Sequence, residues 1–548
     1  MEKVLFIIPP YTSYESFVNP SFNERTVVKK SGNYGSVLTD MPIGLISMSA
    51  YLKKNAIVEV KLLDFNIILN ELEDFKYDSF SGLFRDILSS GEWKGYAPSI
   101  TGISTLFATS YYNMLDLADV VREIFSNTLI VAGGGVPTNM YNEIFKASKS
   151  FDALCFGEGE KPLLNLVKAE NKKELLYSHP AWITKEKIQE KSVFRFDFIE
   201  DLDEIPFYDF DLLNVKQYTL NPTVAVFASY KGKNRIFHTA VSRGCTLRCV
   251  FCASHSVHGR KMRYHSLRRV KEDLILLKEK YGAEIVGFQD DHFLADPDRA
   301  EKILKITKEL GLGIFFQSGL ALYALNRKML EAIKDAGLNQ ITIAVESGSD
   351  RVLKEIMHKP INLEMAKRVV KDCRELGIET DANILIGLPG ETKRDLEDSR
   401  LFLRTLNVNW FRIYIATPLI GSEMLKICIE KNYLKGDYSG RDFKKAGIET
   451  EDFTAEYIQE QAYLLNLEIN FVYNSDIRLK NYQGAVKSFD NVLKVKSDHA
   501  FAYYYLAKCH KALKLEDKYQ EYKKKYEEQL VKTGSWKKYA EYFKLENL

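Results

Sequence analysis

The sequence Cys245-Thr-Leu-Arg-Cys249-Val-Phe-Cys252 follows the apolar run Phe237-His-Thr-Ala-Val241 and the triplet Ser-Arg-Gly. The apolar run predicts a strand, so the three thiols lie on a loop that leaves a strand and can converge on one metal centre. Thiolate is the ligand type that holds iron-sulfur clusters. Three cysteines would leave the fourth iron of a cluster without a protein ligand, and an open coordination site is what lets a metal bind a reactant.

Zinc is the alternative metal, because His255 and His258 follow closely and would allow a Cys3His site. A disulfide framework is disfavoured, because seven cysteines in 548 residues without a secretory signal fit a reducing cytosol. The C-x3-C-x2-C pattern, with the aromatic Phe251 directly before the last cysteine, resembles the signature of the radical S-adenosylmethionine (SAM) superfamily. This resemblance implies that Cys245, Cys249 and Cys252 hold a [4Fe-4S] cluster.

The composition predicts several globular domains and no polyanion-binding surface. A chain of 548 residues is long enough for three or four domains, and 46% hydrophobic residues with a net charge of +2 give no indication of nucleic-acid binding. No apolar run reaches the roughly eighteen residues of a membrane span, and Pro9-Pro10 come too early for a signal peptide. We therefore expect a cytoplasmic protein without a membrane span.

The first 175 residues alternate short apolar runs with helical patterns. Val4-Leu-Phe-Ile-Ile8, closed by Pro9-Pro10, is typical of a buried parallel strand that ends at a loop. The alternation predicts an α/β domain with a doubly wound, Rossmann-like sheet, in which ligands bind beyond the carboxyl ends of the strands. Further strands are predicted at residues 58–63, 100–104, 128–132 and 153–156, and helices at 43–52 and 112–125.

The predicted strand ends carry an ordered set of glycines and prolines. Pro9-Pro10, Pro42-Ile-Gly44, Gly133-Gly134 and Gly157-Glu-Gly-Glu160 together resemble the cobalamin-binding domain that precedes the radical SAM domain in a large subfamily. Glycine-rich turns after strands also serve as tight connections, and no G-x-G-x-x-G motif favours a dinucleotide. The resemblance implies cobalamin contacts from Pro10, Ile43, Gly44, Ser104, Thr105, Gly133, Gly134, Gly135, Gly157 and Glu158.

One departure from the wider cobalamin family concerns the lower face of the cofactor. Many cobalamin domains ligate cobalt through the histidine of a D-x-H-x-x-G motif, but residues 1–178 contain no histidine. If cobalamin binds here, a histidine from this domain cannot ligate it. The alternative is a domain that keeps the fold and has lost the cofactor.

The rest of the chain divides into three parts. Residues 176–234 have broken periodicity and several prolines, and predict an ordered linker. Residues 235–440 alternate strands and helices in six βα units, which predict a partial (β/α)6 TIM barrel with its chemistry at the carboxyl ends of the strands. Residues 441–548 are helical and TPR-like, with a helix expected over 456–479; fewer than three repeats are expected to pack on the barrel.

The carboxyl ends of the barrel strands carry polar groups that suit SAM. Carboxylates there can bind a ribose diol or an ammonium group, and each could instead cap a helix. By resemblance, Glu346 would hold the ribose, Asp290 or Asp291 the methionyl amine, and the backbones beside Phe251 and Pro389 the adenine. Ser347 and Thr417 complete the implied SAM contacts, and no residue is assigned a catalytic role.

The resemblance implies a class B, cobalamin-dependent radical SAM methyltransferase. In that family reductive cleavage of SAM at the cluster gives a 5′-deoxyadenosyl radical that abstracts hydrogen from the substrate, and methylcobalamin then methylates carbon or phosphorus. The implied partners are a small-molecule, lipid or peptide substrate and an external electron donor such as flavodoxin or ferredoxin. The open alternatives are a radical cyclase or rearrangement enzyme, and a non-catalytic Fe-S scaffold or sensor whose helical tail binds a protein.

Overall fold

The computed structural model describes residues 1–20, 26–37, 39–218, 235–440, 445–545 and 548, so residues 219–234 of the predicted linker (176–234) lie outside the described residues. The described chain forms two compact units of α/β structure. The first takes the described residues of Met1–Leu220, Asn234–Leu312 and Pro418–Phe443, and the second takes those of Gly313–Thr417 and Lys444–Leu548.

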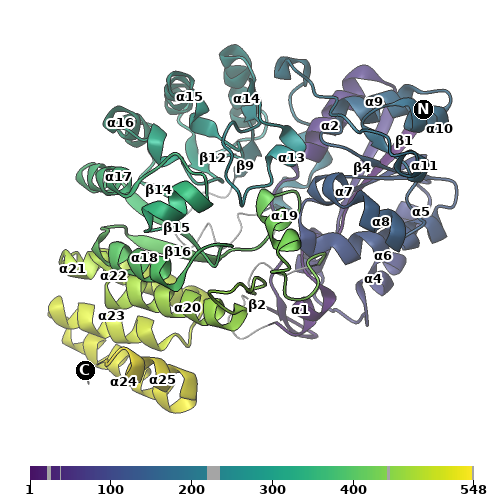
Figure 1. Cartoon of the computed structure of the whole chain (residues 1–548). Helices are drawn as coiled ribbons and strands as arrows, with labels where there is room; N and C mark the ends of the chain where they lie inside the picture. Colours follow the sequence, from purple (N-terminus) through teal and green to yellow (C-terminus); the bar gives the residue numbers. More distant parts are fainter. Residues whose placement is uncertain (21–25, 38, 219–234, 441–444, 546–547) are drawn as a thin grey trace. The chain divides into compact units, whose positions relative to one another are not determined.

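The first unit begins with a six-stranded sheet in the order β4-β1-β5-β6-β7-β8. The first five strands in this order are parallel, and the short β8 runs antiparallel to β7. Helices cover both faces, with α2 and α9 on one and α4 and α6 on the other (Figure 1). The strands are β1 (Glu2–Ile8), β4 (Val58–Asp64), β5 (Ile100–Ser104), β6 (Leu129–Gly133), β7 (Ala153–Cys155) and β8 (Trp182–Ile183); the helices are α2 (Ile43–Asn55), α4 (Phe80–Leu88), α6 (Tyr111–Ile124) and α9 (Glu160–Lys168).

Burial of both faces explains why these strands are continuous apolar runs. Leu5 and Ile7 of β1 belong to the same buried core as Phe84 of α4 and Leu117 of α6, whereas the alternating Phe6 is buried on the other face. From β1 the chain passes to β4 on one side and then to β5 on the other. The strand order therefore reverses between β1 and β5, where open parallel sheets bind ligands.

The remainder of the first unit carries the cysteine motif. β9 (Ile236–Thr239) pairs in parallel with β12 (Ile285–Phe288), and β10 (Ser242–Arg243) pairs antiparallel with β11 (Arg263–Tyr264). The surrounding helices are α13 (His255–His258), α14 (Leu267–Glu279), α15 (Pro297–Glu309) and α19 (Glu423–Glu430).

The second unit contains a parallel sheet, β14-β15-β16, whose strands are connected by helices. The C-terminal helices α22–α25 stack below it in Figure 1. Its elements are β13 (Gly313–Phe316), α16 (Arg327–Asp335), β14 (Gln340–Glu346), α17 (Leu363–Glu375), β15 (Glu379–Ile386), α18 (Lys393–Thr405), β16 (Trp410–Ile415), α20 (Ala455–Leu467), η8 (Glu468–Val472), α21 (Ser475–Arg478), α22 (Tyr482–Val495), α23 (Ala500–Ala512), α24 (Glu516–Lys532) and α25 (Gly534–Tyr542).

The expected packing of the C-terminal region is confirmed within this unit. The amide of Asn470 accepts from the backbone N–H of Phe411 and donates to its carbonyl, at 2.8 Å in each case, so it satisfies the open edge of β16. Arg374 of α17 also pairs with Asp476 at 2.6 Å. These polar contacts attach the helices to the sheet.

The single helix expected over 456–479 was wrong, because the π-helical segment η8 interrupts it. There the N–H of Tyr473 bonds to the carbonyl of Glu468, five residues earlier, which widens the turn. The wider turn lets Asn470 reach β16 while Phe471 stays in the core. The periodicity of the sequence does not reveal this change of phase.

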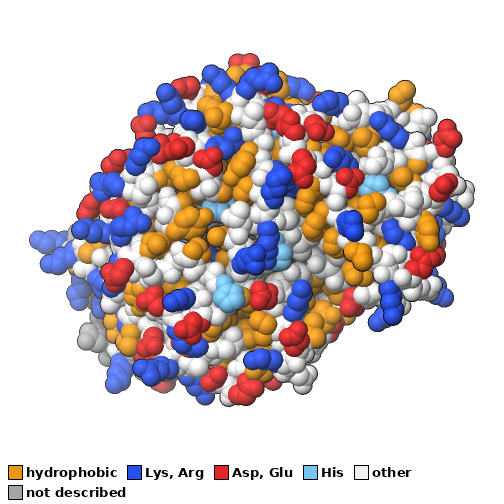
Figure 2. Space-filling view, turned by 45° about the horizontal axis from the view of Figure 1, so that its top comes forward, with side chains coloured by type: hydrophobic (Ala, Val, Ile, Leu, Met, Phe, Trp, Pro, Cys, Tyr) orange, Lys and Arg blue, Asp and Glu red, His pale blue; other side chains and the backbone are white. Residues whose placement is uncertain are grey.

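Surface charge, membrane spans and disulfides are three further features of the described chain. In Figure 2, basic and acidic side chains are interspersed on the visible face. Among the described residues, no helix is both long and apolar enough to cross a membrane. No disulfide joins the seven cysteines, all of which lie in the described part of the chain.

Candidate active site

The cysteine motif forms a loop closed at its base by the β10–β11 ladder. Gly244 joins β10 to Cys245 with φ of +92°, and a Cβ there would lie 2.3 Å from the carbonyl oxygen of Lys261, so this position requires glycine. A turn then links the N–H of Cys252 to the carbonyl of Cys249 at 3.1 Å. All three cysteines are half-buried, which leaves their thiols accessible to a ligand.

A cluster and a single ion make different demands on the three thiols. In the described residues, no group of three or more Cys, His, Asp or Glu side chains is arranged to hold one metal ion. In an iron-sulfur cluster each cysteine binds its own iron, so the sulfurs need not reach a common point. A tetrahedral zinc ion would need four ligands at one point.

The two histidines of the zinc alternative are placed differently from each other. The Nδ1 of His258 lies 2.8 Å from Glu158 Oε1 and is occupied by that contact. His255 lies at the start of α13. Its pKa is lowered mainly by burial and further by the nearby positive charges of Arg260 and Lys426. Neither histidine joins the cysteines in a group of metal ligands within the described chain.

Two glutamates after β7 form buried ion pairs with the strands at the base of the cysteine loop. Glu158 contacts Arg243 at 3.1 Å and Arg263 at 2.5 Å, and Glu160 contacts Arg243 at 2.6 Å. The sequence interpretation assigned no role to either arginine. Arg243, in the run Ser-Arg-Gly-Cys directly before the motif, is the visible sign of a charged site. Its partners Glu158 and Glu160 lie much earlier in the sequence, so the sequence does not show the pairing.

Asp290 and Asp291 follow β12 and differ in environment. Asp290 is buried and accepts hydrogen bonds from the backbone N–H of Val241 and from the hydroxyl of Ser242. It therefore fixes the segment before the cysteines. Burial raises its pKa to about 6. Asp291 is half-buried on the same turn. Phe251, the other predicted SAM contact of this unit, lies between Cys249 and Cys252.

In the second unit, Glu346 ends β14 in an unusual backbone conformation. Its φ is +65°, a region that non-glycine residues seldom adopt, and the register of β14 shifts just before it. Lys359 Nζ lies 2.8 Å from Glu346 Oε1, and both side chains are nearly buried. Backbone strain of this kind persists where the surrounding structure enforces it, which is common at ligand sites.

The remaining predicted SAM contacts of this unit lie on the loops after β14, β15 and β16. Ser347 contacts the hydroxyl of Ser399 and accepts from the N–H of Ser349. Pro389 is half-buried in the loop where Glu391 accepts from the N–H groups of Gly387 and Leu388. Thr417 donates to the carbonyl of Ile415 at 3.3 Å.

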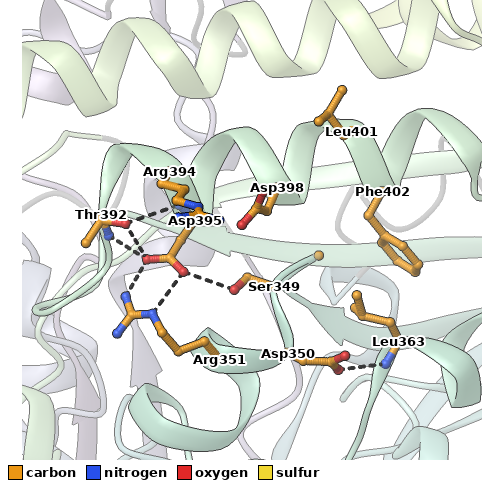
Figure 3. A pocket seen from close by; sticks show the side chains of 11 residues that line it. Ser349, Asp350, Arg351, Leu363, Thr392, Arg394, Asp395, Asp398, Leu401 and Phe402 are labelled. Carbon is orange, nitrogen blue, oxygen red and sulfur yellow. Dashed lines mark hydrogen bonds and ion pairs between the residues drawn. The ribbon is translucent and has the colours of Figure 1, made fainter.

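A pocket of about 560 Å³ lies beside these loops, between the segment after Ser347 and helix α18 (Figure 3). Within it Arg351 points at Asp395, and Ser349 and Thr392 also donate to this carboxylate. Burial acts to raise the pKa of Asp395, but these hydrogen bonds hold it well below its usual range. The polar groups of the pocket are thus largely paired with each other, as in a helix cap.

The predicted cobalamin contacts gather at the carboxyl edge of the first sheet. Pro10 follows β1, and Ile43 and Gly44 open α2. Ser104 ends β5 and Thr105 follows it, Gly133 ends β6 and Gly134 and Gly135 follow it, and Gly157 follows β7. Parallel strands bring these ends together. Glu158, on the same loop as Gly157, is the member whose carboxylate is already engaged by arginines.

The chemistry of this edge fits a large ligand with polar and apolar parts. The hydroxyl of Thr105 is fully buried and has no hydrogen-bond partner among the described residues. Next to it, Leu106 and Phe107 are 53% and 43% exposed. Gly134, with φ of +110°, lets the Thr105 carbonyl approach, since a Cβ there would lie 2.4 Å from it. Cobalamin offers a broad ring that Leu106 and Phe107 can contact. No histidine lies in residues 1–178, so none from this part of the chain can ligate its cobalt.

Comparisons with known proteins match the segments that carry both candidate sites. The model of the radical SAM superfamily matches residues 239–403, and the B12 binding domain matches residues 35–167. The cytidylyl-2-hydroxyethylphosphonate methyltransferase of Streptomyces wedmorensis is 28% identical over 432 residues, which cover 73% of this chain and 79% of that protein. An uncharacterized methyltransferase of Pyrococcus horikoshii is 27% identical over 434 residues, 79% of this chain and 84% of the relative.

A solved structure shares the fold. OxsB, a cobalamin-dependent SAM radical enzyme with aqua-cobalamin and SAM bound, matches with a TM-score of 0.64 at 14% identity and covers 99% of this chain and 80% of its own. The radical SAM match contains the three cysteines, so the chain carries a radical SAM domain that follows a B12-binding domain. Over most of its length it is similar to the two methyltransferases.

Proposed function

We propose that this enzyme transfers a methyl group to an unactivated carbon, or to phosphorus, of its substrate. The observation that carries the proposal is the cysteine loop of Cys245–Cys252, which lies in the same compact unit as the B12-binding domain. When bound, the cluster and SAM supply a carbon-centred radical and cobalamin supplies the methyl group. The chain's own residues bind and orient these groups and exclude water from the radical.

We assign the binding roles residue by residue. Cys245, Cys249 and Cys252 hold a [4Fe-4S] cluster, because they are half-buried thiols on one loop inside the radical SAM match. Glu346, nearly buried beside Lys359, hydrogen-bonds the SAM ribose. The further SAM contacts are Phe251, Asp290, Asp291, Ser347, Pro389 and Thr417. The cobalamin contacts are Pro10, Ile43, Gly44, Ser104, Thr105, Gly133, Gly134, Gly135 and Gly157.

The architecture that we propose has four parts. A Rossmann-like cobalamin domain spans residues 1–175 and a linker 176–234, followed by a partial (β/α)6 barrel over 235–440 and a TPR-like helical region over 441–548. The strand order of the first sheet and the parallel strands β9, β12 and β14–β16 support the first and third parts. The contacts between Asn470 and Phe411 support a helical region that belongs to the barrel.

The substrate class follows from the family and the relatives. The Streptomyces wedmorensis relative is by name a methyltransferase for cytidylyl-2-hydroxyethylphosphonate, a small organic molecule. We propose a small organic substrate for this enzyme and an electron donor of the flavodoxin or ferredoxin type. The absence of disulfides among the seven cysteines supports a reducing, cytoplasmic setting.

Methyl-labelled SAM tests this function. The anaerobically reconstituted enzyme, given a reductant, cobalamin and a panel of small organic substrates, should release 5′-deoxyadenosine and place label in the product. If 5′-deoxyadenosine forms with a converted but unlabelled product, the enzyme is a cyclase or a rearrangement enzyme. Intact SAM, under conditions where cluster and corrinoid absorption are both present, would contradict radical chemistry altogether.

A further inference from the structure

The two arginines that bind Glu158 lie opposite each other at the base of the cysteine loop. Arg243 and Arg263 are register partners in the β10–β11 ladder, and the residues between them include all three cysteines and α13. Their side chains are 9% and 2% exposed. Two buried like charges on facing strands repel each other, so the ladder needs a counter-charge to close.

The counter-charge comes from the loop after β7 of the B12-binding domain. Glu158, whose side chain is 3% exposed, takes Arg263 through both carboxylate oxygens, at 2.9 and 2.5 Å, and Arg243 at 3.1 Å. Glu160 binds the other side of Arg243 at 2.6 Å and accepts from the hydroxyl of Ser47. Burial alone would raise the pKa of Glu158, but the arginines and His258 hold it far below its usual range.

Further contacts tie the loop itself to the same domain and to α19. The Nδ1 of His258 lies 2.8 Å from Glu158, and Asn139 of helix α7 (Gly135–Asn139) donates to the hydroxyl of Ser256 at 2.9 Å. The N–H of Met424 in α19 donates to the carbonyl of Val250, between the second and third cysteines, at 2.9 Å. The conformation of the cysteine loop is therefore set from outside the loop.

We propose that Glu158 is a positioning residue for the cluster, which fixes the base of the cysteine loop through Arg243 and Arg263. This inference rests on the proposed function, because it concerns the cluster that the three cysteines would hold. It gives Glu158 a different task from contacting cobalamin, although Glu158 neighbours Gly157 on the same loop. Through it, the B12-binding domain shapes the metal site of the radical SAM domain.

Glu158→Gln tests the proposal with little change of shape. The amide keeps one acceptor oxygen but leaves the two arginines with one fewer negative charge, so the ladder should loosen while the thiols remain. We expect iron content near that of the wild type, an altered electron paramagnetic resonance (EPR) spectrum of the reduced cluster, and a weaker spectral change on adding SAM. Because misplacement by about 1 Å can cost on the order of 100-fold, SAM cleavage should slow by about 10- to 100-fold.

Glu200→Gln is the matched control, because Glu200 pairs with Lys261 at 2.8 Å with both side chains largely exposed. Its spectrum and SAM cleavage should equal those of the wild type. If Glu158→Gln does not fold, Arg263→Lys replaces it, since lysine keeps the charge and loses the two-pronged contact with Glu158. Arg263→Lys should then show the same spectral change.

The outcomes separate this proposal from the proposed function. A wild-type protein that forms no [4Fe-4S] cluster on anaerobic reconstitution overturns both. A wild type with a cluster that cleaves SAM, together with a folded Glu158→Gln or Arg263→Lys variant of unchanged EPR spectrum and unchanged cleavage rate, overturns the positioning role and leaves the function intact. An altered spectrum at wild-type iron content supports it.

Discussion

Lys359 Nζ and Glu346 Oε1 lie 2.8 Å apart at the end of β14, where Glu346 adopts a φ of +65°. The pair shows that the proposed ribose ligand is held by a cation before SAM arrives. A nearly buried carboxylate paired with a cation is a strong hydrogen-bond acceptor, and its partner fixes the direction in which the carboxylate points. The orientation of Glu346 therefore depends on Lys359 as well as on its own backbone.

Glu346→Gln should weaken SAM binding about tenfold. A charge-assisted hydrogen bond contributes roughly 1.5–3 kcal/mol, and the amide retains part of it. Lys359→Met should weaken binding too, because Glu346 loses its orienting partner. Calorimetric titration of the reconstituted protein with SAM measures both effects. Lys367→Met removes an exposed pair with Glu364 and should leave the affinity unchanged; an unaltered affinity in Glu346→Gln would remove Glu346 from the SAM site.

Replacement of Cys245, Cys249 and Cys252 by Ala should abolish bound iron after reconstitution. Each thiolate ligates a separate iron in the proposed cluster, so loss of all three removes every protein ligand. Iron analysis and visible absorption measure the effect. Cys373→Ala is the matched control, because this thiol is buried in α17, away from the motif in the sequence. The variant should retain full iron content. Iron bound equally well by the triple variant would disprove the assignment.

Leu106→Asp should lower corrinoid retention without loss of iron. This side chain is 53% exposed beside the buried hydroxyl of Thr105, and a carboxylate there would be desolvated by an apolar ring. Corrinoid absorption after gel filtration of cobalamin-loaded protein measures the loss. Leu276→Asp, at an exposed position of α14, serves as control, and equal retention by both variants would place cobalamin elsewhere.

The sequence predicted those elements whose pattern is long enough to be specific. The predicted strand at 100–104 matches β5, and those at 58–63, 128–132 and 153–156 match β4, β6 and β7 to within one residue. Continuous apolar runs of this length between helices have few other interpretations. The strand ends then follow, and with them the loops that carry the cysteines and Glu346.

Short strands and distant ion pairs could not be predicted in the same way. The hairpin of β2 (Thr26–Lys29) and β3 (Gly32–Gly35) has too few residues for a period to show, as do β8, β10 and β11. Arg263 and Glu158 are 105 residues apart, and nothing local indicates that they pair. Such contacts depend on tertiary packing rather than on local preference.

Glu391→Gln should make the enzyme more stable in alkaline solution. Glu391 is fully buried in the loop after β15, and burial raises its pKa to about 8 from an ordinary 4.5, despite hydrogen bonds from two backbone N–H groups. The folded state thus holds a proton that the unfolded state releases. Stability from this group is fully present below about pH 4.5 and declines as the pH rises towards 8, by at most about 1.4 kcal/mol per pH unit.

Urea unfolding of both proteins between pH 5 and pH 9 measures this difference. Glutamine cannot ionise, and its carbonyl can still accept from the N–H groups of Gly387 and Leu388, so the advantage of the variant should grow from pH 5 to pH 8 and then level off. Glu397→Gln, at a position of α18 whose side chain is 56% exposed, should follow the wild type throughout, because solvent surrounds this side chain in the folded and the unfolded state. Parallel curves for wild type and Glu391→Gln would mean that Glu391 is already ionised in the fold at neutral pH, with its second oxygen, which has no hydrogen-bond partner here, stabilised by solvent or a bound cation.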